Sequence, residues 1–402
     1  MKSKLILPFA CAAGLFIASC TADRQTITFN IKGLGNDTIA VKCVPISKYG
    51  KNEPPIEDTI LSINGKFHYY LPVDEGAIMT FQPASLVKKE ISVSTHPITQ
   101  FMLLIAEPND RLKVTGRLRG SNYIEYQVKG SSLMADYVKV RESYATERIL
   151  HDSLKVQEYY YMFSKKAADM QMKHRDSLIY AIRDERNKLA GEIREKELRY
   201  IKNHLSADLS GYLLLYQPYD TVAVYYEQLS ESVKTGLFAN ALDEEYLKTQ
   251  KYLLRKQAEK SIVEGGTAPN FTLKNLDGED FSLSSQKGKY VVLDFWGSWC
   301  GWCIKGFPKM KEYYAKYKSK VEFIGIACMD KDEKWRKSIK NNELNWLHVI
   351  DDESGDVTKN VSAKYAVKGY PTKIILDKDL KIAKIVVGES EEFYEELDKR
   401  LK

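Results

Sequence analysis

The spacing of apolar residues changes its period twice along the 402-residue chain, so no single regular architecture accounts for all of it. From about residue 26 to 128 apolar and polar residues alternate, as around Ile27 and Phe29, which is typical of half-buried antiparallel strands. From about 133 to 263 apolar residues recur at helical spacing, and from Phe271 onward candidate strands and helices alternate. The pattern predicts an all-β (sandwich or barrel) N-terminal domain, an α-helical middle region and an α/β C-terminal domain.

The first residues have the composition of an export signal. Lys2 and Lys4 precede an apolar run over residues 5–17, which has the length of a secretory signal and is too short to span a bilayer. The run ends in Ile17-Ala18-Ser19-Cys20, which resembles the lipobox of bacterial lipoproteins, in which the cysteine is acylated. The resemblance implies a signal peptide over residues 1–19, lipidation of Cys20 and a lipid anchor at a membrane. An ordinary signal peptide with an incidental Cys20 is the alternative.

Breaks in the pattern suggest where the later domains begin. Gly265-Gly266 and Pro269 end the helical region. We therefore expect a β-rich domain over residues 20–130, a helical region over 131–262 and an α/β domain over 263–402.

Turn dipeptides and apolar runs predict individual elements. Asn64-Gly65 and Asp277-Gly278 are each flanked by candidate strands and predict two-residue hairpins. Residues 290–295 form a continuous apolar run, as expected of a central strand buried on both faces. The remaining predicted elements of the α/β domain are strands at 321–328, 347–350, 373–376 and 381–387 and helices at 302–317, 335–341 and 391–401.

Charge and cysteine content narrow the function classes. The 60 Lys and Arg exceed the 54 Asp and Glu by only six over the whole chain, which does not favour nucleic acid as a partner. Export would permit disulfides. Four cysteines follow Cys20, too few for a disulfide-stapled scaffold of this length, so a local pair favours redox chemistry. Two of them, Cys43 and Cys328, lie in apolar strands and are interpreted as core residues.

A Cys-x-x-Cys pair follows the predicted central strand and begins a predicted helix. Unpaired N–H groups and the dipole at a helix N-terminus stabilise an anion, so Cys300 is the predicted nucleophile. The two intervening residues let Cys303 reach the Cys300 sulfur, which allows disulfide exchange within the pair. No flavin or nicotinamide fingerprint occurs, so we expect no cofactor besides this redox-active pair.

Three signals in order resemble the thioredoxin superfamily. They are the octapeptide Trp-Gly-Ser-Trp-Cys-Gly-Trp-Cys over residues 296–303, Pro308 in the following helix, and Tyr370-Pro371-Thr372, which matches a cis-proline loop. Residues 263–402 are similar to the TlpA/ResA branch of envelope thiol-disulfide oxidoreductases. The resemblance implies a thioredoxin-like C-terminal domain and a protein-disulfide oxidoreductase.

The resemblance also implies roles for single residues. Cys300 would attack a partner disulfide, and Cys303 would then attack Cys300 and release the reduced partner. Pro371 would be cis and would face the sulfurs. Asp294 would be the buried carboxyl group that carries a proton to or from Cys303. Substrate contacts would come from Trp299, Gly301, Trp302 and Tyr370.

Partners follow from the same branch. The substrates would be thiols and disulfides of exported proteins, with apocytochrome c as one candidate. A membrane thiol transporter would be the electron donor. Exchange would run in the reducing direction. The location would be the bacterial cell envelope, facing the periplasm. Many members of the branch carry a Glu three residues after the second cysteine, where this chain has Gly306, so the acid-base work would fall to Asp294.

Other readings of the motif are weaker. A structural zinc site needs two further ligands, and none of the six His forms a pair at short spacing, so no metal is expected. A thiol peroxidase would need Pro-x-x-x-Ser/Thr-x-x-Cys, and Leu293 and Trp296 stand where that Pro would precede Cys300 and Cys303. A surface binding lipoprotein with an accessory redox domain remains an alternative, because residues 20–262 show no catalytic pattern.

Overall fold

The computed structural model describes residues 25–401 except 52, 87–100, 120–122 and 352–354. Cys20 and the predicted signal peptide therefore lie outside the described residues. Contacts divide the chain into two compact units, which are described separately. One contains the residues up to Leu213 together with Glu231–Phe238, and the other contains Leu214–Ser230 and the residues from Ala239 onward. The predicted boundary at 262/263 falls inside the second unit and stays a prediction.

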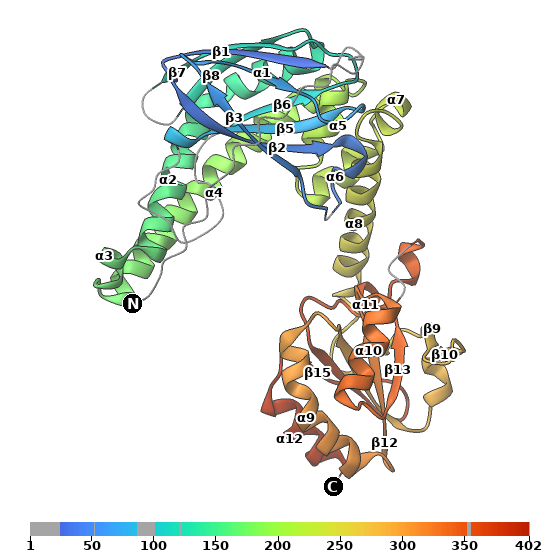
Figure 1. Ribbon diagram of the computed structural model, residues 1–402. Coiled ribbons are helices and arrows are strands. Elements are labelled where there is room, and N and C mark those ends of the chain that lie inside the picture. The colour runs from blue at the N-terminus through green and yellow to red at the C-terminus, as the bar shows by residue number, and fades with distance from the viewer. Residues whose placement is uncertain (1–24, 52, 87–100, 120–122, 352–354, 402) are drawn as a thin grey trace, which may run out of the picture. The chain divides into compact units, whose positions relative to one another are not determined.

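The first unit is built on two four-stranded sheets, in the orders β4-β1-β7-β8 and β3-β2-β5-β6 (Figure 1). Aromatic side chains join their inner faces: the ring centroid of Phe81 in β5 lies 4.6 Å from that of Phe29 in β1 and 5.4 Å from that of Tyr69 in β4. The predicted all-β region is confirmed, in its sandwich form. The strands are β1 (Thr26–Lys32), β2 (Asp37–Pro45), β3 (Ile56–Ser62), β4 (Lys66–Tyr70), β5 (Ala77–Pro83), β6 (Met102–Ala106), β7 (Lys113–Arg119) and β8 (Tyr123–Lys129).

The Asn64-Gly65 turn forms, but the predicted hairpin is wrong. Both residues have positive φ, as a type I′ turn requires, and Ile63 and Lys66 exchange two backbone hydrogen bonds across it. Beyond this bridge the strands separate, because β3 pairs with β2 in one sheet and β4 with β1 in the other. The turn therefore leads the chain from one sheet to the other.

Helices make up most of the described residues that follow. The buried apolar residues of α4 are Ile179, Leu189, Ile193 and Ile201, and α4 packs along α2. No helix of the described residues is both long and apolar enough for a membrane span. These helices are α1 (Ser132–Ser143), α2 (Ala145–Phe163), α3 (Lys165–Ala168), α4 (Met172–Asn203), α5 (Asp208–Leu214), α6 (Tyr219–Tyr226), α7 (Glu231–Lys234) and α8 (Ala239–Ala258).

A seven-stranded sheet in the order β10-β9-β13-β12-β11-β14-β15 organises the second unit. Strands β11, β12 and β13 are parallel, and β14 runs antiparallel to β11. The predicted hairpin at Asp277-Gly278 is confirmed as the antiparallel pair β9 and β10. The elements are β9 (Thr272–Asn275), β10 (Asp280–Ser282), β11 (Tyr290–Trp296), α9 (Gly301–Tyr317), β12 (Val321–Ala327), α10 (Asp332–Asn342), β13 (Leu347–Ile350), α11 (Val361–Lys364), β14 (Thr372–Leu376), β15 (Ile382–Val387) and α12 (Glu391–Leu401).

Strand β11 is buried on both faces, as its apolar run predicts. Val292 and Trp296 belong to the core formed with α9, α10 and α12, whereas Leu293 and Phe295 belong to the core on the opposite face, with α11. Because side chains alternate along a strand, Asp294 points to the same face as α9. The fold thus places one acidic side chain under the helix that begins at the cysteine pair.

Gly65 and Gly35 offer a matched test of the crossover between the two sheets. Both have positive φ, +75° and +69°, but a Cβ on Gly65 would lie 2.1 Å from the Ile31 carbonyl oxygen, whereas a Cβ on Gly35 would meet no atom within 4 Å. We expect Gly35→Ala to lower the free energy of unfolding by about 1–2 kcal/mol, the cost of a left-handed backbone. Gly65→Ala should cost clearly more in the same urea titration, and equal losses would contradict this account.

Candidate active site

The two cysteines of the motif form a disulfide at the start of α9, with sulfurs 2.05 Å apart. Cys300 is the N-cap residue, and its sulfur accepts a hydrogen bond from the backbone N–H of Cys303 at 3.2 Å. Both cysteines are nearly buried, at 6% and 3% exposure. A sulfur at this position faces the unpaired N–H groups and the positive end of the helix dipole, which favour a thiolate once the pair is reduced.

The loop before the pair is fixed by polar contacts. The Ser298 N–H and hydroxyl both donate to the Asp330 carboxylate, at 2.6 and 2.7 Å, and the Trp299 indole N–H donates to the Cys328 carbonyl at 3.1 Å. A Cβ on Gly297 would lie 2.4 Å from the Trp299 indole nitrogen, so only glycine leaves room for this ring. The loop therefore holds Trp299 in one place beside the disulfide.

The Tyr370–Pro371 peptide bond is cis. The Tyr370 ring makes an edge contact with the Trp299 ring, with centroids 5.3 Å apart, and packs against the core cluster that contains both cysteines. The structure thus brings the cis-proline loop into contact with the loop that precedes the disulfide.

Aromatic side chains surround the disulfide at the surface. Trp299 is 50% exposed and Trp302 is 66% exposed, while Gly301 between the cysteines presents backbone to solvent. The Lys305 ammonium group lies 4.5 Å from the centre of the Trp302 ring. A buried disulfide edged by exposed indoles is suited to exchange with a partner that docks on this surface.

The chain is similar to proteins named thiol-disulfide oxidoreductases. Residues 265–385 match the AhpC/TSA family. The thiol-disulfide oxidoreductase ResA of Bacillus thuringiensis subsp. konkukian is 37% identical over 145 residues, which cover 36% of this chain and 80% of that protein. ResA of Bacillus subtilis is 35% identical over 129 residues, which cover 32% of this chain and 69% of that protein. The chain belongs to the ResA-like thiol-disulfide oxidoreductases.

A solved structure was also found: the thioredoxin domain of a thiol-disulfide oxidoreductase from Bacteroides vulgatus, with a TM-score of 0.33 and 30% identity over 35% of this chain and 99% of that one. The thioredoxin-like fold predicted for the C-terminal domain of this ResA-like protein is confirmed by the family match, and so is the prediction of a protein-disulfide oxidoreductase.

Behind the disulfide, the ResA-like protein carries buried charges. Asp294 is 3% exposed, and its Oδ1 lies 3.7 Å from the Nζ of Lys373 on the neighbouring strand β14. This distance is too long for a hydrogen bond, and Oδ1 accepts none from the described residues. Burial raises the pKa of Asp294, the Lys373 charge lowers it, and the nearby Glu389 carboxylate raises it. Asp294 therefore holds a proton at higher pH than an exposed carboxyl group does.

Neither Lys373 nor Glu389 is among the site residues predicted from the sequence. Lys373 is 3% exposed in a strand whose other residues, Thr372 and Ile374 to Leu376, are also buried. The sequence does offer one signal for Lys373, which is a lysine inside an apolar strand. Since buried lysines are almost always paired, such a lysine predicts an acidic partner nearby. Glu389 follows β15 and has no comparable sequence signal.

The other two cysteines of the described chain are not part of the disulfide. Cys43 and Cys328 are buried thiols, and burial raises the pKa of the Cys43 thiol to about 11. This placement suits the interpretation of both as core residues. The described residues contain no group of three or more His, Cys, Asp or Glu side chains placed to hold a metal ion.

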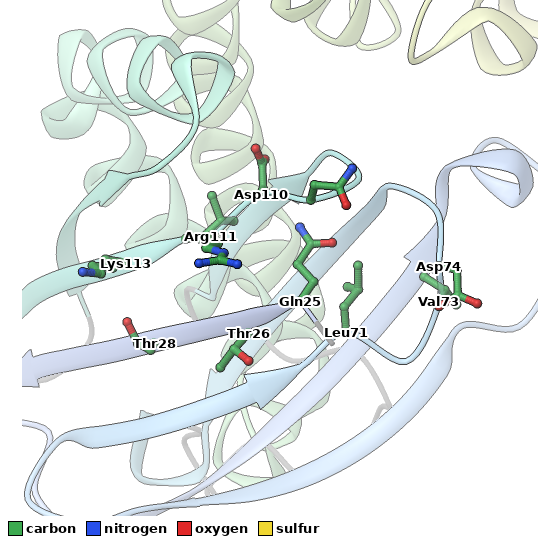
Figure 2. Close-up of a pocket in the computed structure, with 11 residues that line it drawn as sticks. Gln25, Thr26, Thr28, Leu71, Val73, Asp74, Asp110, Arg111 and Lys113 are labelled. Atoms are coloured by element: carbon green, nitrogen blue, oxygen red, sulfur yellow. The ribbon is translucent and has the colours of Figure 1, made fainter. Parts of the chain in front are cut away.

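The first unit contains a polar pocket of about 540 Å³ (Figure 2). Its lining comes from the start of β1, from the segment after β4 and from the segment that leads into β7. Charged groups of both signs line it, among them Asp74, Asp110, Arg111 and Lys113. No cysteine is among its lining residues.

The burial of Asp294 predicts a pH-dependent stability. A carboxyl group whose pKa is raised on folding favours the folded state at low pH, and this contribution is lost as the pH rises through the folded pKa. Asp294→Asn should therefore unfold at higher urea concentration than wild type at neutral pH, with a difference that shrinks toward acid pH. Lys373 keeps its Glu389 partner in this variant.

Asp280→Asn is the control, because the Lys274–Asp280 pair is at the surface and such pairs contribute little. An Asp294→Asn variant that is less stable than wild type at neutral pH would refute the predicted sign.

Proposed function

We propose that this protein reduces disulfides of exported proteins by exchange at the Cys300–Cys303 pair. The observation that carries the proposal is the disulfide itself, placed at the N-terminus of α9 and edged by two exposed indoles. The family match supports thiol-disulfide chemistry. The use of this motif, the reducing direction and the exported substrates are parts of the proposal.

The exchange proceeds through a mixed disulfide. In the reduced protein the Cys300 thiolate attacks one sulfur of a partner disulfide, forming a bond to it and displacing the partner's second sulfur as a thiolate, which takes a proton from water. Cys303 then attacks the Cys300 sulfur and displaces the first partner sulfur. Two electrons pass to the partner, and the Cys300–Cys303 bond is restored.

Cys303 has to lose a proton before it attacks, and Asp294 is the proposed acceptor. Its carboxyl group points to the same sheet face as α9 and has an oxygen with no hydrogen bond from the described residues. A base with a raised pKa matches the affinity of a thiol more closely than an ordinary carboxylate does.

Substrate contacts are assigned to Trp299, Gly301, Trp302 and Tyr370, with Pro371 next to the pair. The exposed indole faces offer apolar contact area. Pairing of the Tyr370 backbone with an extended substrate segment follows from the resemblance to the thioredoxin superfamily. Each cycle consumes the two electrons of the pair. A membrane thiol transporter is the proposed donor, and apocytochrome c is one candidate substrate.

The proposed location is the bacterial envelope, facing the periplasm, with lipidated Cys20 as the membrane anchor. Support comes from the lipobox-like sequence before Cys20. Several acyl chains on one residue hold a protein stably at a membrane, since each buried CH₂ contributes about 0.8 kcal/mol.

A binding function for the first unit is a second candidate, favoured by the polar pocket of Figure 2, whose charged lining would suit a small polar ligand. A peroxidase is disfavoured, because Leu293 and Trp296, at the positions where the peroxidase proline would stand, are wholly buried in β11.

The exchange mechanism predicts a trapped intermediate. Cys303→Ala removes the resolving sulfur, so the mixed disulfide on Cys300 should accumulate in cells and be visible as a higher-mass species on non-reducing gels. The additional Cys300→Ser substitution should abolish the species, and mass spectrometry of the adduct identifies the partner. If no Cys300-linked species accumulates, the proposed exchange is wrong.

The proposed anchor predicts a change in fractionation. Cys20→Ala should move the protein from the membrane fraction to the soluble fraction of the envelope, because the acylated residue is lost. Cys328→Ala, which alters a buried thiol, is the control and should leave fractionation unchanged. Membrane association that survives Cys20→Ala would contradict lipidation at this residue.

A further inference from the structure

The second unit contains a row of polar groups that contact one another on the sheet face beneath α9. Lys373 Nζ lies 2.7 Å from Glu389 Oε2 and 3.7 Å from Asp294 Oδ1, so one ammonium group is shared unequally by two carboxylates. The Tyr394 hydroxyl donates to the other oxygen of Glu389 at 2.6 Å. Lys373 has 4% of its side chain exposed and Glu389 has 21%. The Glu389 end of the row is thus the one open to solvent.

The position of Glu389 depends on a missing side chain in α9. A Cβ on Gly306 would lie 2.2 Å from Glu389 Oε2, so the carboxylate rests against the bare backbone of the helix. Gly306 follows Cys303 by three residues, which places the two on the same side of α9. The acidic group therefore sits one helical turn from the resolving cysteine.

Lys373 shares the sheet face of Asp294 and of the disulfide. Its strand neighbour two positions on, Ile375, belongs to the same core cluster as both cysteines, and alternation puts Lys373 with it. Lys373 therefore lies on the sheet face that carries Asp294, beneath α9.

We propose that Lys373 and Glu389 are positioning residues that set the proton affinity of Asp294, and through it the ease with which Cys303 is deprotonated. Lys373 stabilises the Asp294 carboxylate. Glu389 has the opposite effect, because it holds Lys373 away from Asp294 and its own negative charge disfavours the Asp294 carboxylate. This rests on the proposed role of Asp294 in the exchange.

Few charged or titratable groups of the described residues face Asp294 and could change its proton affinity. Strand β14 contributes Lys373, the segment after β15 contributes Glu389, and α12 contributes the Tyr394 hydroxyl, whose proton Glu389 accepts. On β12 the residue opposite Asp294 is Gly325, and the buried His348 imidazole of β13 occupies the space where a Gly325 side chain would lie. Burial lowers the pKa of His348 to about 3. Helix α9 contributes Cys303 on the same face. The directions of the Lys373 and Glu389 effects on the pKa of Asp294 are opposite.

The test follows the attack by Cys303 in a single turnover of the full chain. Ellman's reagent reacts with the reduced pair: Cys300 displaces one thionitrobenzoate and forms a mixed disulfide, and Cys303 then displaces the second while its proton passes to Asp294. The two thiols supply the two electrons that the reagent disulfide accepts. The rate of the second release against pH gives the apparent pKa of the coupled Cys303 and Asp294 pair.

Two variants should move this midpoint in opposite directions. Lys373→Met removes the cation that stabilises the carboxylate and should move it up by about one pH unit or more. Glu389→Gln is nearly isosteric, leaves Lys373 to Asp294 alone and should move the midpoint down. Glu391→Gln removes an exposed acidic group two residues away, paired with Lys309, and should leave it unchanged.

The outcomes separate the two proposals. A purely structural role would lower the rate at every pH without moving the midpoint, and midpoints that stay fixed or move the same way in both variants overturn the inference. If Lys373→Met fails to fold, the downward shift in Glu389→Gln decides alone. Failure of the proposed function looks different: wild type gives no second release, or the release persists in Cys303→Ala, or Asp294→Asn leaves the wild-type midpoint unchanged.

Discussion

The burial of β11 on both faces is the constraint on which the active site depends. The strand pairs with β12 on one side and β14 on the other, so its end and the start of α9 are fixed relative to the sheet. A helix that begins at that point directs its free N–H groups at Cys300. Without the strand, the same Cys-x-x-Cys sequence would lack both the dipole and the core on which Cys303 packs.

The same burial makes charged groups beneath the disulfide costly. Removing Asp294 and Lys373 from water is unfavourable, and an attraction across 3.7 Å without a hydrogen bond offsets only part of the cost. Replacing a buried ion pair by apolar residues of similar volume is often neutral or stabilising. The retention of two carboxylates around one lysine is therefore better explained by acid-base chemistry than by stability, which is consistent with the raised pKa of Asp294.

Much of the fold could be predicted from local pattern, since hydrophobic period and turn residues act over a few positions. The second unit follows this rule closely, from the β9–β10 hairpin to α12. Strand β5 is harder to recognise, because it begins with three consecutive buried residues and ends in Pro83, so buried and half-buried positions alternate only over Met79–Pro83. The pairing of β3 and β4 with different sheets could not be read from the Asn64-Gly65 turn, because the turn defines the link and not the partners.

The chemical site divides in the same way. The cysteines and the residues around them lie together in sequence or carry a recognisable motif, so they could be identified as candidates. Glu389 reaches the site from a segment 83 residues after Gly306, and only packing brings the two together. Because Gly306 carries no carboxylate, the sequence predicts that Asp294 acts alone. A carboxylate does lie beside Gly306, but it belongs to Glu389, which follows β15. A glycine on one element can thus leave space for an acidic side chain from a distant element. The spacing of residues along the sequence does not reveal such a contact.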